Sequence, residues 1–63
     1  MRPTNAMIGK EITIINRPPW HVFKRISGIF TGREAGIIII ETPYKTKQSF
    51  RLDEWKIESV KYL

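Results

Sequence analysis

Apolar and polar residues alternate in several short stretches of the chain, which is the pattern of half-buried β-strands. The first two stretches are residues 10–15 and 24–31. Residues 37–40 are four consecutive isoleucines, too few for a helix and apolar on both faces, so they predict a central strand covered on two sides. Residues 48–52 alternate again, and residues 56–63 form the last predicted strand. The pattern therefore predicts an all-β fold of five strands.

Prolines and glycines mark the boundaries between these strands. Pro18 and Pro19 end the first strand, because proline has no N–H donor and moves the preceding residue out of helical geometry. Gly28, inside the second strand, predicts a bend, since a glycine in a strand often marks a bulge or a barrel corner. Residues 32–36 contain two glycines and predict a hairpin turn. Together these signals predict a small, strongly bent, five-stranded barrel.

The C-terminal segment admits two predictions. Residues 53–55 favour a single helical turn, capped by Asp53, before the last strand. Ile57, Val60 and Leu63 are spaced by three, however, so a terminal helix beginning at Asp53 is the alternative.

The chain of 63 residues is long enough for one small domain. Residues 1–9 lack periodicity and predict a flexible N-terminal tail, with Met7 and Ile8 able to pack against the core, while residues 10–63 form the single barrel domain. The absence of cysteine excludes disulfides and predicts a reducing, cytoplasmic compartment. No apolar run is long enough for a signal peptide or a membrane span, so we expect no membrane association.

The order of strands resembles the small barrels of the Src-homology, Tudor and Sm-like kind. Residues 26–32 (ISGIFTG) and 36–41 (GIIIIE) are similar to the first motif of Sm-like proteins, which has a glycine in the bent second strand and an apolar third strand. The resemblance implies an Sm-like fold and allows a ring. Residues 33–36 contain neither the aspartate nor the asparagine with which Sm proteins recognise bases, so no uridine pocket is implied.

The C-terminal half is also similar to another family. Residues 50–55 (FRLDEW), followed by Ile57 and Val60, resemble the strand, helical turn and strand that close Src-homology-type barrels. The sequence does not separate the two families, and neither fold decides function by itself.

The inventory of reactive side chains argues against catalysis. The chain has no cysteine and one histidine, His21, so a nucleophile–base–orienter arrangement is improbable. The acidic residues are scattered among lysines and arginines, as on a solvated surface, and no glycine-rich phosphate loop is present. We therefore expect a protein that is not an enzyme, with no catalytic residues, metal site, cofactor or small-molecule substrate.

The charge points to a polyanionic partner. Eleven lysines and arginines against six acids give a net charge of +5, which attracts nucleic acid. Basic and aromatic residues are interleaved, as in single-strand binding sites where cations follow the phosphates and rings stack on bases. The candidate nucleic-acid-binding residues form two clusters and one hairpin tip: Arg17, Trp20, His21, Lys24 and Arg25; Tyr44, Lys45, Lys47 and Arg51; and Arg33.

Each aromatic residue also has a structural interpretation. Trp20 and Phe23 can plug the open end of the barrel, and Trp55 is expected in the core, because so short a chain can hardly leave large apolar side chains exposed. Tyr44, on a polar loop, is the aromatic residue most readily exposed. Arg33 is either a phosphate contact or a solubilising charge.

Three functions remain open. The first is non-catalytic binding of nucleic acid, RNA or single-stranded DNA, with an Sm-like oligomer as one form. The second is a protein-interaction module or inhibitor, of phage or plasmid type, that docks on a larger protein complex through its basic loops. The third is a structural subunit that assembles by pairing strand edges, for which residues 37–40 are the support.

Overall fold

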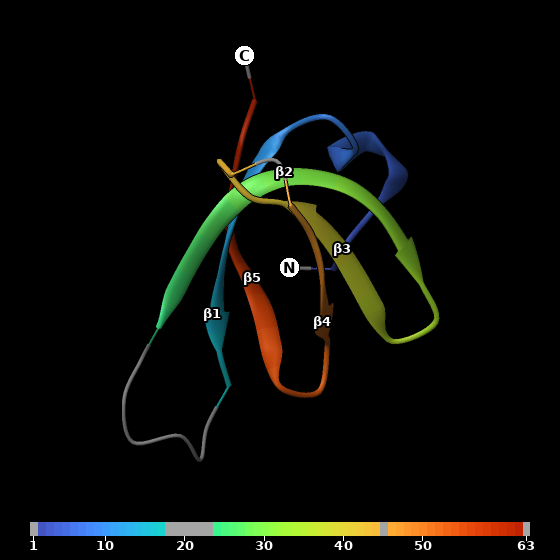
Figure 1. The fold of residues 1–63 in the computed structure, drawn as a ribbon. Coiled ribbons are helices and arrows are strands. Elements are labelled where there is room, and N and C mark those ends of the chain that lie inside the picture. Colours follow the sequence, from blue (N-terminus) through green and yellow to red (C-terminus); the bar gives the residue numbers. More distant parts are fainter. Residues whose placement is uncertain (1, 18–23, 45, 63) are drawn as a thin grey trace.

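The computed structural model describes residues 2–17, 24–44 and 46–62, and its backbone forms one antiparallel sheet (Figure 1). The strands are β1 (Glu11–Asn16), β2 (Arg25–Glu34), β3 (Ile37–Glu41), β4 (Lys47–Arg51) and β5 (Trp55–Lys61). A short 3-10 helix, η1 (Asn5–Met7), precedes them. The all-β class and the five strands predicted from the alternation are confirmed.

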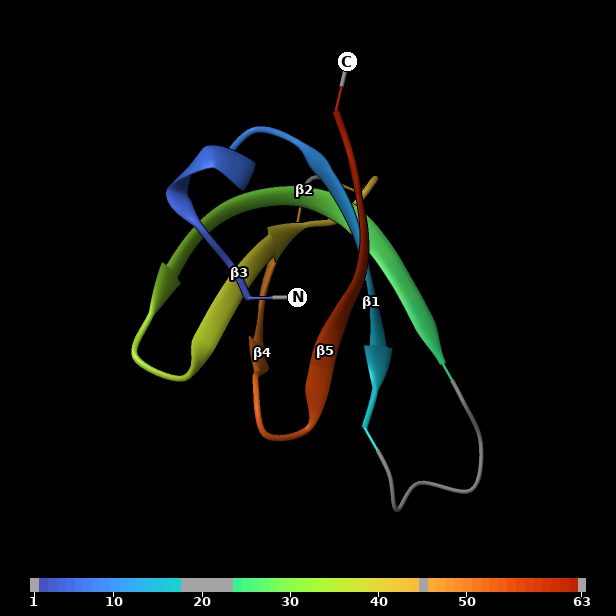
Figure 2. The same ribbon diagram turned by 180° about the vertical axis from the view of Figure 1, so that it is seen from behind.

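The sheet is curled into an open barrel. The strand order is β4-β3-β2-β1-β5, which makes β4 and β5 the two edges. Each neighbouring pair is antiparallel, and no ladder joins β4 to β5 in the part of the chain that the structure describes. Figure 2 shows the two edge strands following one another through a tight turn. The sheet thus wraps around the core without closing by hydrogen bonds.

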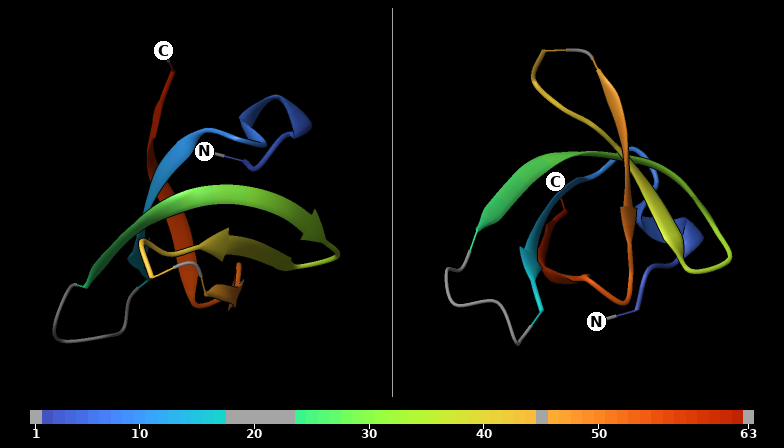
Figure 3. Two further views of the ribbon diagram at one scale, coloured as in Figure 1. Left: turned by 45° about the horizontal axis from the view of Figure 1, so that its top comes forward. Right: turned by 60° about the horizontal axis from the view of Figure 1, so that its bottom comes forward.

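β2 is the longest strand, and it arches over the others (Figure 3). Gly28 lies in it where β3 approaches: a Cβ added there would be 2.5 Å from Ile40 Cγ2 and 2.6 Å from the carbonyl oxygen of Glu41. The register between β2 and β3 shifts between Phe30 and Gly32, which makes Thr31 an extra residue, and such a bulge bends a strand. The bend predicted for this strand therefore combines a close approach at Gly28 with a bulge three residues later.

The core lies on the inner face of the curled sheet. Its fully buried side chains come from β1, β2 and β3, and they are Ile12, Ile14, Phe30, Ile38 and Ile40. Burying each such side chain contributes about 1.5–3 kcal/mol to folding. In β3 the alternate residues Ile37 and Ile39 lie on the outer face and are half-buried. This strand is therefore covered fully on its inner face and partly on its outer face.

The N-terminal segment contacts the sheet at its end. Met7 is buried in the core, whereas Ile8 is exposed. The N–H of Gly9 donates to the carbonyl of Phe30 at 2.7 Å, and the N–H of Phe30 donates to the carbonyl of Lys10 at 2.9 Å. The segment that leads into β1 is thereby attached to β2.

The C-terminal segment is a strand, and the alternative of a terminal helix is wrong. Ile57 lies opposite Ile14 and Val60 lies opposite Ile12, because the register of β5 against β1 shifts by one residue. This β-bulge allows two residues spaced by three to share the inner face of a strand. The bulge therefore explains why Ile57 and Val60 are spaced by three, as in a helix, although they lie in a strand.

Tight turns join the later strands. Gly36, at the turn between β2 and β3, has φ +74°, which glycine adopts without strain. Residues 52–54 form a single turn before β5, where the N–H of Glu54 donates to the carbonyl of Arg51 at 3.1 Å. This turn lies one residue before the helical turn predicted at residues 53–55.

Candidate nucleic-acid interface

The outer face of the sheet carries the polar residues that alternate with the core. On β1 this face carries Glu11, Thr13 and Ile15, of which Ile15 is apolar and buried, and each has a partner on both neighbouring strands. The three cross-strand rows differ in chemistry. Along β1 residues two apart are separated by about 7 Å, so the first and third rows lie about 14 Å apart.

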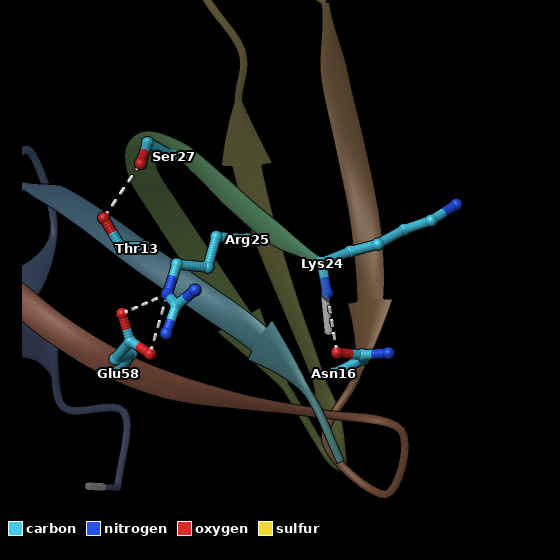
Figure 4. A network of polar contacts seen from close by, with 6 residues as sticks. All are labelled: Thr13, Asn16, Lys24, Arg25, Ser27 and Glu58. Atoms are coloured by element: carbon cyan, nitrogen blue, oxygen red, sulfur yellow. Dashed lines mark hydrogen bonds and ion pairs between the residues drawn. The ribbon is translucent and has the colours of Figure 1, made fainter. Parts of the chain in front are cut away.

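The row through Ile15 is basic. Arg25 of β2 lies opposite Ile15 on one side, and Lys56 of β5 lies opposite it on the other. Lys24 precedes Arg25, and its backbone N–H donates to Asn16 Oδ1 at 2.9 Å. Figure 4 shows its side chain pointing away from that of Arg25, as expected for consecutive residues of an extended chain. We call Arg25 and Lys56 the basic row, and Lys24 lies beside it.

Arg25 is held by an ion pair. Its Nε donates to Glu58 Oε1 at 2.9 Å and to Oε2 at 3.0 Å, as Figure 4 shows. The hydrogen bond and then the charge of Glu58 raise the pKa of Arg25 above its usual value. The Arg25 side chain is nevertheless 60% exposed, so the pair stabilises the fold little and leaves the guanidinium accessible.

The row through Thr13 carries hydroxyl groups. Thr13 Oγ1 and Ser27 Oγ share a hydrogen bond of 2.8 Å, and Ser59 lies opposite Thr13 on β5. Hydroxyl groups, guanidinium and ammonium groups are the donors that proteins use toward phosphate oxygens. The basic row and this hydroxyl row together can bind a phosphate backbone without any reading of bases.

Arg17 has a structural contact that the sequence did not reveal. Its Nε donates to the carbonyls of Leu52 at 2.7 Å and Trp55 at 3.2 Å, while its backbone N–H donates to the carbonyl of Glu54 at 2.7 Å. These bonds attach the end of β1 to the turn between the two edge strands. Arg17 therefore serves the fold, although it is exposed.

Arg51 lies at the same turn and is engaged by acids of the turn. Its Nη2 is 2.7 Å from Asp53 Oδ2, and its Nε is 3.7 Å from Glu54 Oε1. The structure thus brings Arg17 and Arg51, from different predicted clusters, to one turn.

Tyr44 and Lys47 lie on the connection from β3 into β4. Tyr44 is 90% exposed, as its polar surroundings predicted, and Lys47 is exposed as well. Arg33 is exposed near the opposite end of β2 from Arg25. The predicted residues are therefore distributed over several parts of the surface, and of them only Arg25 lies in the basic row, with Lys24 next to it in the sequence.

Three of the predicted residues, Trp20, His21 and Lys45, lie outside the described residues, as does the expected plug residue Phe23. Trp55 packs edge-on against Phe50, with ring centroids 5.3 Å apart, and it is half-buried beside the core, as expected.

Lys56 was not among the predicted site residues. It is separated in sequence from both basic clusters, and only the pairing of β5 with β1 brings it beside Arg25. The signal that could have found it is the strand alternation of residues 56–63, which puts it on the face opposite Ile57.

No three or more histidine, cysteine, aspartate or glutamate residues among those that the structure describes are placed to hold a metal ion. No helix among the same residues is long and apolar enough to cross a membrane.

The chain is similar in sequence to part of a larger protein. It is 31% identical over 55 residues to the GTPase Era of Thermotoga maritima, and 31% identical over 55 residues to that of Thermotoga petrophila. Each match covers 87% of this chain and 18% of the relative, so the chain spans less than a fifth of the length of these curated relatives. No family model matches the chain. No solved structure matches it either.

Proposed function

We propose that this chain is a non-catalytic nucleic-acid-binding module that holds RNA or single-stranded DNA through its phosphates. The observation that carries the proposal is the basic row, in which the exposed Arg25 and Lys56 flank the buried Ile15, with Lys24 adjacent to Arg25 in the sequence. The hydroxyl row adjoins it and supplies further donors.

The distribution of ion pairs adds to this argument. Asp53, Glu54 and Glu58 are paired with Arg51 and Arg25. Half of the six acids are therefore engaged, while Lys24, Lys47 and Lys56 make no ion pair in the described part of the chain. The net charge of +5 is consequently carried by exposed ammonium and guanidinium groups, which attract a polyanion.

Tyr44 supplies the second element of single-strand binding. An exposed ring can stack on a base at about 1–3 kcal/mol, whatever the base. With 90% of its surface exposed and Lys47 beginning the next strand, Tyr44 is available for this role.

The similarity to GTPase Era does not extend the proposal to nucleotide hydrolysis. The matched segment is 18% of that protein, and the glycine-rich loop with lysine that cradles phosphates in such enzymes does not occur in this sequence. The proposal rests on the surface of this chain.

Assembly through strand edges stays a prediction. β4 and β5 are edge strands, and free edges can pair with another chain. Light scattering of the purified protein decides between a monomer and an oligomer, including an Sm-like ring.

The test of binding is fluorescence anisotropy of labelled 12-nucleotide RNA and DNA single strands titrated with the protein at two salt concentrations. Binding should weaken with salt, with a slope of about −0.7 in log–log form for each phosphate contact. Absent or salt-insensitive binding would contradict the proposal. A pull-down that returned one stoichiometric protein despite nuclease treatment would favour the protein-interaction alternative.

A further inference from the structure

The third row of the outer face differs from the basic row in composition. It runs across all five strands, with Glu11 of β1 between Ile29 and Lys61, and Ile29 in turn opposite Glu41, which lies opposite Lys47. The order across the sheet is therefore cation, anion, apolar, anion, cation. We call these five residues the acidic row, after the two glutamates that flank Ile29 at its centre.

Ile29 is an unusual residue for this position. It is 40% exposed, in a chain whose other strand isoleucines are buried or half-buried. A hollow of about 470 Å³ lies beside it, lined by Glu11, Ser27, Ile29, Glu41 and Thr42 among others. A smaller hollow, of about 190 Å³, adjoins Ile29 on the side of Lys61. An exposed apolar side chain between two hollows can pack against an apolar side chain of a partner protein.

The carboxylates beside Ile29 are free to bind. Neither Glu11 nor Glu41 takes part in an ion pair within the described residues, whereas Asp53, Glu54 and Glu58 all do. Two of the three acids that remain unpaired thus lie on either side of one apolar residue. The two carboxylates attract cationic groups to the centre of the row, whereas Lys47 and Lys61 lie at its ends.

We propose that the acidic row is a second binding surface, which takes an extended peptide segment carrying an apolar side chain between two basic ones. The apolar side chain packs on Ile29, and the two ammonium or guanidinium groups reach Glu11 and Glu41. The outer face then has two roles, with nucleic acid on the basic row and a cationic protein segment at Glu11, Ile29 and Glu41. This inference does not depend on the proposed nucleic-acid function.

The charge order argues against a second copy of the same row as the occupant. Two such rows stacked in register place like charges opposite each other at every charged position, and like charges at an interface are unfavourable. The complementary order is anion, cation, apolar, cation, anion. A basic segment of another protein can supply the cation, apolar and cation groups at the centre of this complementary order, whereas an identical row cannot.

The experiment is a titration of the full isotope-labelled chain with the peptide Lys-Gly-Leu-Gly-Lys, blocked at both ends, followed by amide chemical shifts. Shifts should concentrate at Glu11, Ser27, Ile29 and Thr42. The matched peptides Glu-Gly-Leu-Gly-Glu and Lys-Gly-Gly-Gly-Lys test the charges and the apolar side chain separately, and both should bind at least about threefold more weakly.

Two variants give the decisive comparison. The double substitution Glu11→Gln and Glu41→Gln should weaken peptide binding by at least about threefold, while Glu34→Gln, which neutralises an unpaired acid outside the hollow, should leave it unchanged. Circular dichroism confirms that each variant folds. Shifts spread over all the acids, or equal losses in both variants, would show unspecific charge attraction and overturn the proposal. Dimerisation through this row, seen as shifts that depend on protein concentration without peptide, would overturn it as well.

Discussion

Gly28 of β2 lies so close to Ile40 of β3 that a Cβ at the glycine would be 2.5 Å from Ile40 Cγ2. The same Cβ would be 2.6 Å from the carbonyl oxygen of Glu41, which cannot move without breaking the ladder between the two strands. The packing of β2 on β3 thus requires the absence of a side chain at residue 28.

Replacing this glycine by alanine should therefore destabilise the protein. We expect Gly28→Ala to lower the free energy of unfolding by about 1–3 kcal/mol, as overpacking does. Gly32→Ala in the same strand is the matched control, since a Cβ there meets nothing within 4 Å, and its effect should be less than about 1 kcal/mol. Urea unfolding followed by circular dichroism measures both, and equal effects would contradict this account of the bend.

We expect Arg17 to stabilise the folded protein rather than to bind nucleic acid. Arg17→Met removes the Nε bonds to the carbonyls of Leu52 and Trp55 while keeping a long side chain. We expect a loss of about 1–2 kcal/mol in unfolding free energy, because two acceptors lose a charged donor. Thermal unfolding measures the loss. An unchanged melting temperature with weaker nucleic-acid binding would instead assign Arg17 to the interface.

Tyr44 should show the opposite behaviour. Because its side chain is 90% exposed, Tyr44→Ala should change the stability by less than about 0.5 kcal/mol. The same change should weaken binding of a single strand by about 1–3 kcal/mol if the ring stacks on a base, whereas Tyr44→Phe keeps the ring and should keep the affinity. Anisotropy with one labelled oligonucleotide compares the three proteins, and equal affinities would remove Tyr44 from the interface.

Glu58 should act as an internal competitor for Arg25. Glu58→Gln weakens the pair with Nε and leaves the guanidinium for a phosphate, so nucleic-acid binding should tighten. Glu34→Gln adds the same net charge at the far end of β2 and should tighten it less. If both variants tighten binding equally, net charge alone is responsible.

The raised pKa of Arg25 has a defined consequence for pH dependence. A group whose pKa is raised by folding contributes its stability below its unfolded pKa and loses it only as the pH rises through the folded value. The ordinary pKa of arginine already lies far above neutrality and that of Arg25 is raised further, so Arg25 stays charged throughout the range from about pH 5 to 9. The contribution of Arg25 to binding should therefore be constant across that range.

Local patterns sufficed where a strand has a regular apolar face, as Ile12 and Ile14 give β1. They left a strand and a helix both open at the last element, because the bulge that puts Ile57 and Val60 on the same face gives a strand the spacing of a helix. A bulge is specified by the pairing of distant strands, which a local pattern does not contain.

The candidate site was less accessible to prediction for the same reason. Lys24 and Arg25 were identified because they are neighbours in sequence, but Lys56 joins them only through β1. Arg17 and Arg51 carry the same charge as these residues, and only their contacts at the turn before β5 reveal that Arg17 serves the fold and that Arg51 is paired with acids of the turn. Composition gives the sign of the net charge, whereas the register of the sheet decides which charged side chains lie side by side.

The most direct test of the proposed function compares two lysines of β5. Lys56 lies in the basic row, and Lys61 lies opposite Glu11 in the acidic row; both are exposed. Single-stranded RNA binding is measured by anisotropy over a series of salt concentrations for Lys56→Gln and Lys61→Gln. Lys56→Gln should weaken binding and reduce the salt slope by about 0.7, while Lys61→Gln, with the same net charge, should leave the slope near that of the unmodified protein. Equal slopes for the two variants would contradict a phosphate-binding role for the basic row.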